Sequence, residues 1–141
     1  MKKKLFLLFL LFFLLNLFWE VAHSPLYDWN PSMQEYVPHI LLYSFMDAVY
    51  ISILILVISL KNENIKWVNN PARRDMILLT VLGVLLAVFI ELKAFYLGKW
   101  SYNQLMPQVF GLGLSPLIQL AATSIAALWI IKSNEGKYKK I

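Results

Sequence analysis

Four long runs of hydrophobic residues dominate this chain of 141 residues. They cover about residues 5–22, 38–60, 76–97 and 109–131. A helix of about 20 apolar residues crosses the hydrocarbon core of a bilayer. Polar connections with turn residues, such as NNP at 69–71, separate the runs. The pattern predicts an all-α polytopic membrane protein, in which four transmembrane helices form one bundle and residues 1–141 form a single membrane domain.

Capping and breaking residues place the ends of these predicted helices. Pro38 is expected in the first turn of the second helix, where its missing N–H breaks no bond. Asp75 is expected to cap the third helix. Pro116 is expected to kink the fourth helix and to free a carbonyl near residue 112. The glycines of GLGLSP (111–116) lack a phosphate-binding spacing and indicate close packing.

Polar and small residues interrupt the apolar runs at helical spacing, so each predicted helix has one face suited to the bundle interior. Small residues let membrane helices approach closely, and ionisable residues in a membrane usually face the interior or a cavity. The four faces contain Asn16, Glu20 and His23; His39, Tyr43, Asp47 and Tyr50, beside Ser44, Ala48 and Ser52; Gly83, Ala87, Glu91, Ala94 and Gly98; and Gly111, Ser115, Gln119, Ala122 and Ala126.

The ionisable residues lie toward one end of the predicted helices. Measured along the helix axis, Glu91 lies about 9 Å and Asp47 about 13 Å from that end, and Gln119 lies about 15 Å from it. Glu20 and His23 lie at the rim. The other halves, such as ILILVISL (53–60), contain no ionisable residue. We therefore expect a polar pocket with Glu20 and His23 at its mouth and with Asp47 and Gln119 near its floor.

The composition agrees with the membrane class, because 60% of the residues are hydrophobic and only 15% are charged. A soluble domain has about a quarter of its residues charged. The chain has no cysteine, which excludes a disulfide framework, a thiol nucleophile and a thiolate metal site.

The basic residues predict an orientation. Eleven of thirteen lie on one side of the spans, namely Lys2, Lys3, Lys4, Lys61, Lys66, Arg73, Arg74, Lys132, Lys137, Lys139 and Lys140. Cytoplasmic loops carry such an excess, so both termini are predicted to be cytoplasmic in the cell membrane, and the pocket to open away from the cytoplasm. The orientation in the membrane thus explains the net charge of +5, and no nucleic-acid partner is predicted. Lys93 is expected to extend outward, away from Glu91.

The first run also has features of a signal peptide, since KKKLFLLFLLFFLL combines a basic start with an apolar stretch. The following WEVAHSP offers only Ala22 for a cleavage site of small residues. Retention of the first helix is therefore favoured over cleavage.

Asp47 and Glu91 are the strongest functional candidates, because a carboxylate near the middle of a membrane costs about 2.5–3.5 kcal/mol. In the catalytic interpretation one of them donates a proton, and the other, or His39, accepts one. The candidate substrate-binding residues are Glu20, His23, Tyr43, Trp100, Tyr102 and Gln119.

Each binding candidate also has a structural interpretation. Tyr43, Gln119 and Asn16 can bridge helices by hydrogen bonds, and Glu20 and His23 can be interfacial residues. The aromatic residues of the 98–107 connection can form an interfacial belt, which the sequence favours, or a lid over the pocket.

Three functions remain open. One is an enzyme that acts on a lipid or isoprenoid substrate by acid–base chemistry. Another is a non-catalytic protein that binds a lipid or small ligand, or an accessory subunit with a membrane-protein partner. Ion translocation is disfavoured, because a conduit needs polar groups in both halves of the membrane. His23 and His39 could bind a metal with Glu20 or Asp47, but no HExxH-like pattern is present, so no metal and no cofactor are predicted.

GKWSY (98–102), followed by MP (106–107) and GLGLSPLIQ (111–119), resembles the pattern of an uncharacterised family of small prokaryotic four-helix integral membrane proteins. FWE (18–20), Asp47 and Glu91 also fit this pattern, which covers most of the chain. The resemblance implies the four-helix topology and no particular activity. The chain is more faintly similar to small membrane carotenoid (lycopene) cyclases, which have acidic residues and a Trp-x-Tyr element among their helices. It lacks their Pro-Glu-Glu element, which argues against cyclase activity.

Overall fold

The computed structural model describes the backbone of residues 1–29 and 31–138, and the side chains of these residues except 33 and 134–138. Lys139 and Lys140 and the side chain of Lys137, which belong to the basic residues of the predicted cytoplasmic side, lie outside this description. The four long helices are α1 (Lys2–His23), α2 (Met33–Lys61), α3 (Arg73–Tyr96) and α4 (Leu114–Tyr138). Each contains a stretch long and apolar enough to cross a membrane, which agrees with the four predicted runs.

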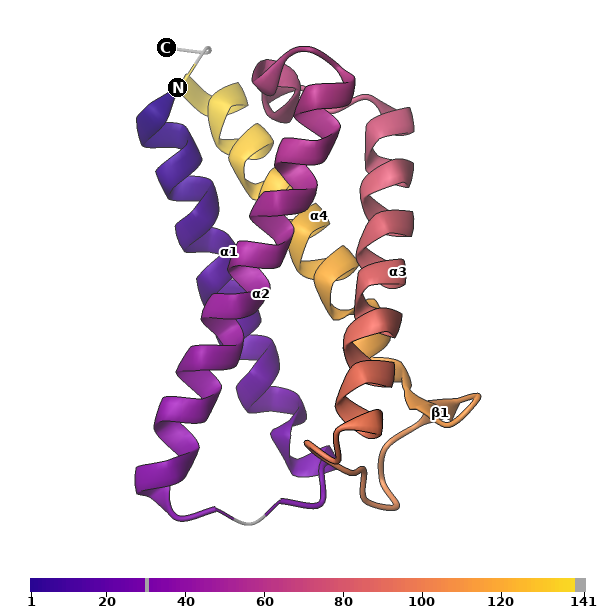
Figure 1. The fold of residues 1–141 in the computed structure, drawn as a ribbon. Coiled ribbons are helices and arrows are strands. Elements are labelled where there is room, and N and C mark those ends of the chain that lie inside the picture. Colours follow the sequence, from indigo (N-terminus) through magenta and orange to yellow (C-terminus); the bar gives the residue numbers. More distant parts are fainter. Residues whose placement is uncertain (30, 139–141) are drawn as a thin grey trace.

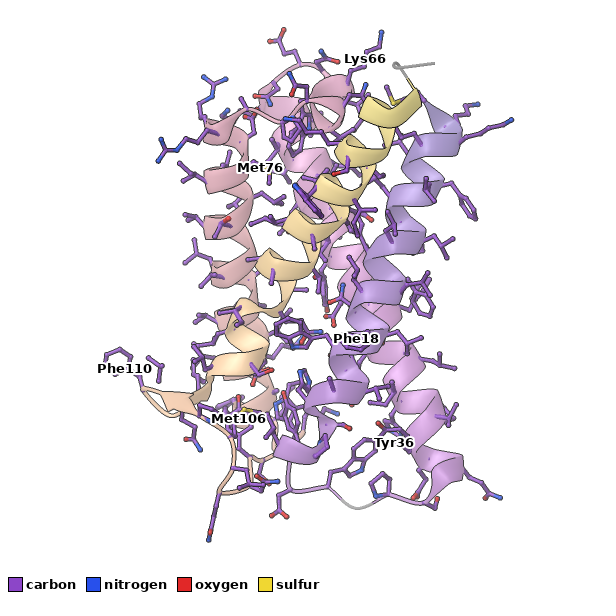
Figure 2. All side chains as sticks on the ribbon, turned by 180° about the vertical axis from the view of Figure 1, so that it is seen from behind. Phe18, Tyr36, Lys66, Met76, Met106 and Phe110 are labelled. Carbon is purple, nitrogen blue, oxygen red and sulfur yellow. The ribbon has the colours of Figure 1, made fainter. Side chains whose placement is uncertain are left out.

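The helices run side by side along the molecule (Figure 1). The beginning of α1, the end of α4 and the connection from α2 to α3 lie together at one end, which we call the terminal end. A short helix η2 (Ile65–Asn69) lies in that connection. At the opposite end lie the connection from α1 to α2, which contains η1 (Ser24–Leu26), and the connection from α3 to α4. Figure 2 shows Lys66 at the terminal end and Tyr36 and Met106 at the opposite end.

The helices are packed unevenly. α1 packs against α2 and α4, and α3 packs mainly against α4. α2 and α3 spread apart toward the opposite end (Figure 1). A buried core of Leu8, Phe12, Ile51, Leu79 and Leu128 joins the four helices nearer the terminal end. The bundle is therefore tight at one end and open between α2 and α3 at the other.

The small-residue face predicted for the third helix is confirmed over most of its length, since Gly83, Ala87, Glu91 and Ala94 are all buried in α3. A Cβ atom on Gly83 would lie 3.1 Å from the backbone nitrogen of Ala121 in α4. The absence of a side chain at Gly83 thus allows the two backbones to approach closely.

The predicted starts of the second and third helices are wrong. α2 begins before Pro38, because the backbone N–H of Ser32 donates to Glu35 Oε2 at 3.1 Å in a capping box. Pro38 therefore lies inside the helix. α3 begins at Arg73 after Ala72, so Asp75 is not its cap. Asp75 is buried in the first turn, and its Oδ1 lies 3.8 Å from Lys61 Nζ.

The predicted start of the fourth helix at residue 109 is also wrong, because residues 108–113 form a hairpin of β1 (Gln108–Val109) and β2 (Leu112–Gly113). Phe110 and Gly111 have φ of 50° and 81°, as a two-residue hairpin turn requires. Gly111 is therefore exposed in a turn and does not belong to an inward face. Pro116 lies in the first turn of α4, where a backbone N–H would have no partner within the helix. The absence of an N–H in proline therefore breaks no helical bond there, and the reason for the predicted kink is lost.

Gly98 is a further error in the predicted faces. It is exposed and follows the end of α3 with φ of 59°. The N–H of Gly98 donates to the carbonyl of Phe95 at 3.1 Å, and that of Lys99 to Ala94 at 2.9 Å. Gly98 thus ends the helix in the left-handed conformation that glycine tolerates best.

Candidate functional site

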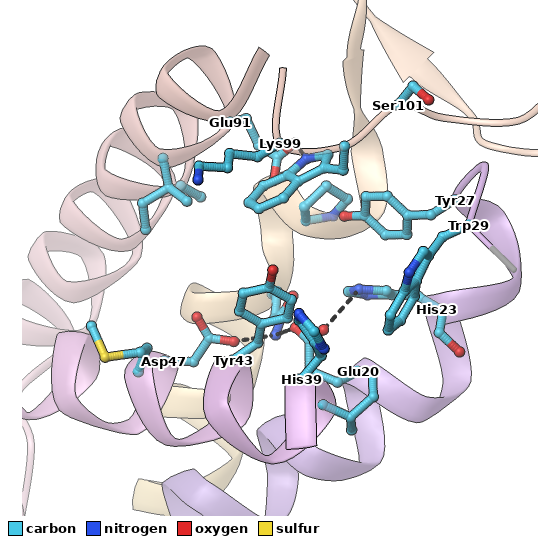
Figure 3. A pocket seen from close by; sticks show the side chains of 18 of the residues that line it. Glu20, His23, Tyr27, Trp29, His39, Tyr43, Asp47, Glu91, Lys99 and Ser101 are labelled. Carbon is cyan, nitrogen blue, oxygen red and sulfur yellow. Dashed lines mark hydrogen bonds and ion pairs between the residues drawn. The ribbon is translucent and has the colours of Figure 1, made fainter. Parts of the chain in front are cut away.

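A cavity of about 650 Å³ lies at the end of the bundle opposite the termini (Figure 3). All four helices line it, together with residues of the two connections at that end. Eight of the nine predicted site residues contribute to its lining, namely Glu20, His23, His39, Tyr43, Asp47, Glu91, Trp100 and Gln119. The ninth, Tyr102, contacts Glu91 from the α3–α4 connection.

Two carboxylate groups meet at one amide on the floor of this cavity. Gln119 Nε2 in α4 donates to Asp47 Oδ2 of α2 at 2.7 Å and to Glu20 Oε1 of α1 at 2.8 Å. Glu20 therefore lies with Asp47 and Gln119, so its predicted place at the mouth of the pocket is wrong. Asn16 Oδ1 is a third acceptor, 3.2 Å from the same nitrogen. An amide nitrogen carries two hydrogens, so three acceptors compete for them. Glu20 and Asp47 therefore approach each other at one nitrogen atom.

His23 extends this cluster toward the outside of the bundle. Its Nε2 lies 3.5 Å from Glu20 Oε2, and its Nδ1 lies 3.2 Å from Ser115 Oγ. Ser115 Oγ accepts a hydrogen bond from Trp19 Nε1 at 3.2 Å. The Ser115 hydroxyl thus links Trp19 and His23 of α1 to α4. Sequence spacing placed Glu20 and His23 on one face but gave no sign of this contact with Ser115.

Glu91 occupies the other side of the cavity, across from Asp47 and Glu20 (Figure 3). It is only 3% exposed, and its Oε2 accepts hydrogen bonds from Trp100 Nε1 at 3.2 Å and from the Tyr102 hydroxyl. Burial and the Glu91 hydrogen bond raise the pKa of Tyr102, so its phenol stays protonated as the donor. The polar atoms of Trp100 and Tyr102 thus point inward to Glu91.

Aromatic rings form a continuous wall above the carboxylates. The Tyr27 ring centroid lies 5.3 Å from that of His23 and 6.3 Å from that of Trp100. Tyr43 joins the same wall, 6.0 Å from both Trp100 and His39. Burial raises the pKa of Tyr27, and the Glu91 charge adds to this effect, so Tyr27 contributes a neutral phenol. Tyr27 was not predicted, because it follows a short helix outside any periodic pattern.

His39 lies at the exposed rim of the cavity. Its Nδ1 is 2.7 Å from the carbonyl oxygen of Glu35, and its ring packs edge-on against Trp29. Among the described residues, no hydrogen bond joins His39 to Asp47 or Glu91. The structure therefore does not bring His39 into direct contact with the carboxylates that it was predicted to serve.

The two connections at this end are fastened together. The Asn103 side chain donates to the carbonyl of Pro25 at 2.6 Å, and its backbone N–H donates to Leu26 at 3.1 Å. The backbone N–H of Asp28 donates to Ser101 at 2.9 Å. These bonds hold the loop of Trp100 and Tyr102 over the cavity. These bonds join segments that are far apart in the sequence, so no local pattern predicts them.

Within the described part of the chain, no three His, Asp or Glu side chains are grouped so as to hold a metal ion. The comparisons with known protein families, with curated proteins and with solved structures each find no match to this chain.

The fastening of the two connections is testable. Replacing Asn103 by Ala removes two side-chain hydrogen bonds to the α1–α2 connection. We expect amide hydrogen exchange in residues 97–107 to become roughly tenfold faster, since one hydrogen bond typically contributes about 0.5–1.5 kcal/mol to stability. Gln104→Ala, which changes the exposed neighbour, should exchange like the parent chain. Equal rates in both variants would show that Asn103 does not hold the loop.

Proposed function

We propose that the chain is a multi-pass protein of the cell membrane, with α1–α4 spanning the bilayer and both termini in the cytoplasm. The four apolar helices support insertion, as do large apolar side chains on the outer surface, such as Phe6, Phe18 and Phe89, which are 63–74% exposed. Exposed basic residues gather at the terminal end, among them Lys61, Arg73 and Arg74, which supports the orientation. The cavity then opens on the side away from the cytoplasm.

This orientation can be measured because the chain contains no cysteine. We expect a single cysteine in place of Gln104 to react with a membrane-impermeant maleimide in intact cells. A single cysteine in place of Lys66 should react only after the cells are permeabilised. The reverse pattern would contradict the orientation, and equal labelling of both positions in intact cells would contradict insertion.

We propose further that the cavity binds the polar end of a lipid or isoprenoid compound and acts on it by acid–base chemistry. The observation that carries this proposal is the convergence of Glu20, Asp47 and Glu91, from three different helices, on one cavity. Ligand cavities commonly measure about 300–1,000 Å³, and this one has about 650 Å³. Neighbouring carboxylates repel each other, and a proton or a ligand cation between them relieves the repulsion.

The two sides of the cavity are suited to different steps. On one side, the close approach of Glu20 and Asp47 favours a proton shared between them, which this pair can donate to a bound ligand. His23, next to Glu20, is placed to replace that proton. On the other side, Trp100 and Tyr102 both donate to Oε2 of Glu91. The second oxygen of Glu91 is then available to accept a proton from the ligand or to face a developing positive charge.

A second candidate is a non-catalytic protein that binds a cationic ligand or lipid, or an accessory subunit of a membrane complex. The aromatic wall favours it, because cations bind well to aromatic faces beside carboxylates. In this case the same residues hold the ligand without transferring a proton.

Neutral variants of the carboxylates distinguish these functions. Asp47→Asn and Glu91→Gln preserve size, and Glu63→Gln is a matched control at an exposed position near the terminal end. Each protein is purified after its thermal stability has been compared with the parent, and its bound lipids are identified by mass spectrometry. We expect a lipid species to accumulate on the first two variants, because substrate binds without turning over. Loss of a lipid bound to the parent would favour the binding function, and an unchanged lipid profile would contradict both.

A further inference from the structure

A second cavity, of about 310 Å³, lies in the gap between α2 and α3. It shares Tyr43, Tyr50, Ile90, Lys99 and Trp100 with the main cavity. The two spaces therefore adjoin along the same side chains, where α2 and α3 spread apart (Figure 1). We call the second space the α2–α3 groove. It joins the acidic cavity to the apolar outer surface of the bundle.

The chemical character of the lining changes along this route. The inner part carries the carboxylates of Glu20 and Asp47. Lys99 lines both spaces, and Lys93 lines the groove alone. Apart from these lysines and the rings of two tyrosines and a tryptophan, the groove is lined by apolar side chains, among them Leu86 and Phe89. From the main cavity into the groove, the lining therefore changes from carboxylates to lysines and apolar side chains.

That order matches one class of membrane molecule. A phospholipid with a primary amine carries the amine at its tip, a phosphate next to it, and acyl chains beyond. An ammonium group donates up to three hydrogen bonds and pairs with carboxylates, and lysines bind phosphate oxygens. Phosphatidylglycerol, in contrast, would place uncharged hydroxyl groups against Glu20 and Asp47.

Resting on the proposed function, we propose that the α2–α3 groove is the lateral access route for an amine-bearing phospholipid. Its amine lies at Glu20 and Asp47, its phosphate at Lys93 and Lys99, and one acyl chain beside Leu86 and Phe89. The hydrogen bonds between the two connections hold a loop across the end of the bundle and so restrict entry from that end. The groove, in contrast, opens between α2 and α3 toward the acyl chains of the bilayer. A lipid therefore enters sideways without leaving the bilayer.

The test measures lipid binding by native mass spectrometry of the purified full chain, with phosphatidylethanolamine and phosphatidylglycerol of identical acyl chains as probes. We expect phosphatidylethanolamine to bind roughly tenfold more tightly, the effect of about 1.4 kcal/mol. Leu86→Trp fills the groove and should weaken this binding roughly tenfold. Leu85→Trp is its control, because Leu85 is 60% exposed on the same helix. The double variant Lys93→Gln with Lys99→Gln should also weaken binding, whereas Lys132→Gln at the other end should not.

The outcomes separate the route from the function. If phosphatidylethanolamine and phosphatidylglycerol bind the parent equally, the amine assignment is wrong. If Leu86→Trp binds like the parent while Asp47→Asn does not, the groove is not the route, and the proposed function stands. If the parent binds neither lipid, both the route and the lipid-binding function fail.

A second measurement uses the parent chain alone, so its result does not depend on whether a variant folds. A phosphatidylethanolamine with a photoactivatable acyl chain is expected to crosslink to the peptide of the parent chain that contains Leu86 and Phe89. Crosslinks confined to the outer face of α1 would overturn the lateral route.

Discussion

Everything at the cavity depends on a shortage of hydrogen-bond donors. Gln119 offers two N–H groups to three acceptors, and two of these are carboxylate oxygens on different helices. In a helix bundle without water, each polar group needs a partner inside the protein. The amide draws Glu20 and Asp47 together but does not satisfy them fully. Their remaining capacity faces the cavity, where a proton or a cationic group can supply what the protein lacks.

The packing of the bundle determines where the carboxylates of Glu20 and Asp47 can reach a ligand. At Gly83 the backbones of α3 and α4 come so close that a Cβ atom would lie 3.1 Å from Ala121. α3 is thereby held against α4, and it diverges from α2 toward the cavity end (Figure 1). Asn103 fastens the two connections across that end. Glu20 and Asp47 are thus covered at the end of the bundle by the α3–α4 connection. On one side they lie beside the opening between α2 and α3.

Periodic patterns in the sequence were sufficient to predict the helices and most of their inward faces. The apolar runs indicate the four helices, and residue spacing places Glu20 with His23 and Gly83 with Glu91. The 108–113 hairpin was missed, because its turn depends on Phe110 in a left-handed conformation that its residue type disfavours. The contacts of Ser115, Tyr27 and Asn103 join distant segments and leave no periodic signal.

The sharing of the Gln119 amide is tested most directly by a double-mutant cycle of Gln119→Leu and Asp47→Leu. The free energy of unfolding of the parent, both single variants and the double variant is measured in the same detergent. Gln119→Leu takes the shared donor from both Asp47 and Glu20, whereas Asp47→Leu leaves the Gln119 amide with Glu20 and Asn16 as acceptors. Once Asp47 is absent, Gln119→Leu therefore costs less, because one carboxylate fewer loses its donor. We predict a coupling energy of about 1–2 kcal/mol between the two positions. Additive effects, with no coupling beyond experimental error, would contradict the account.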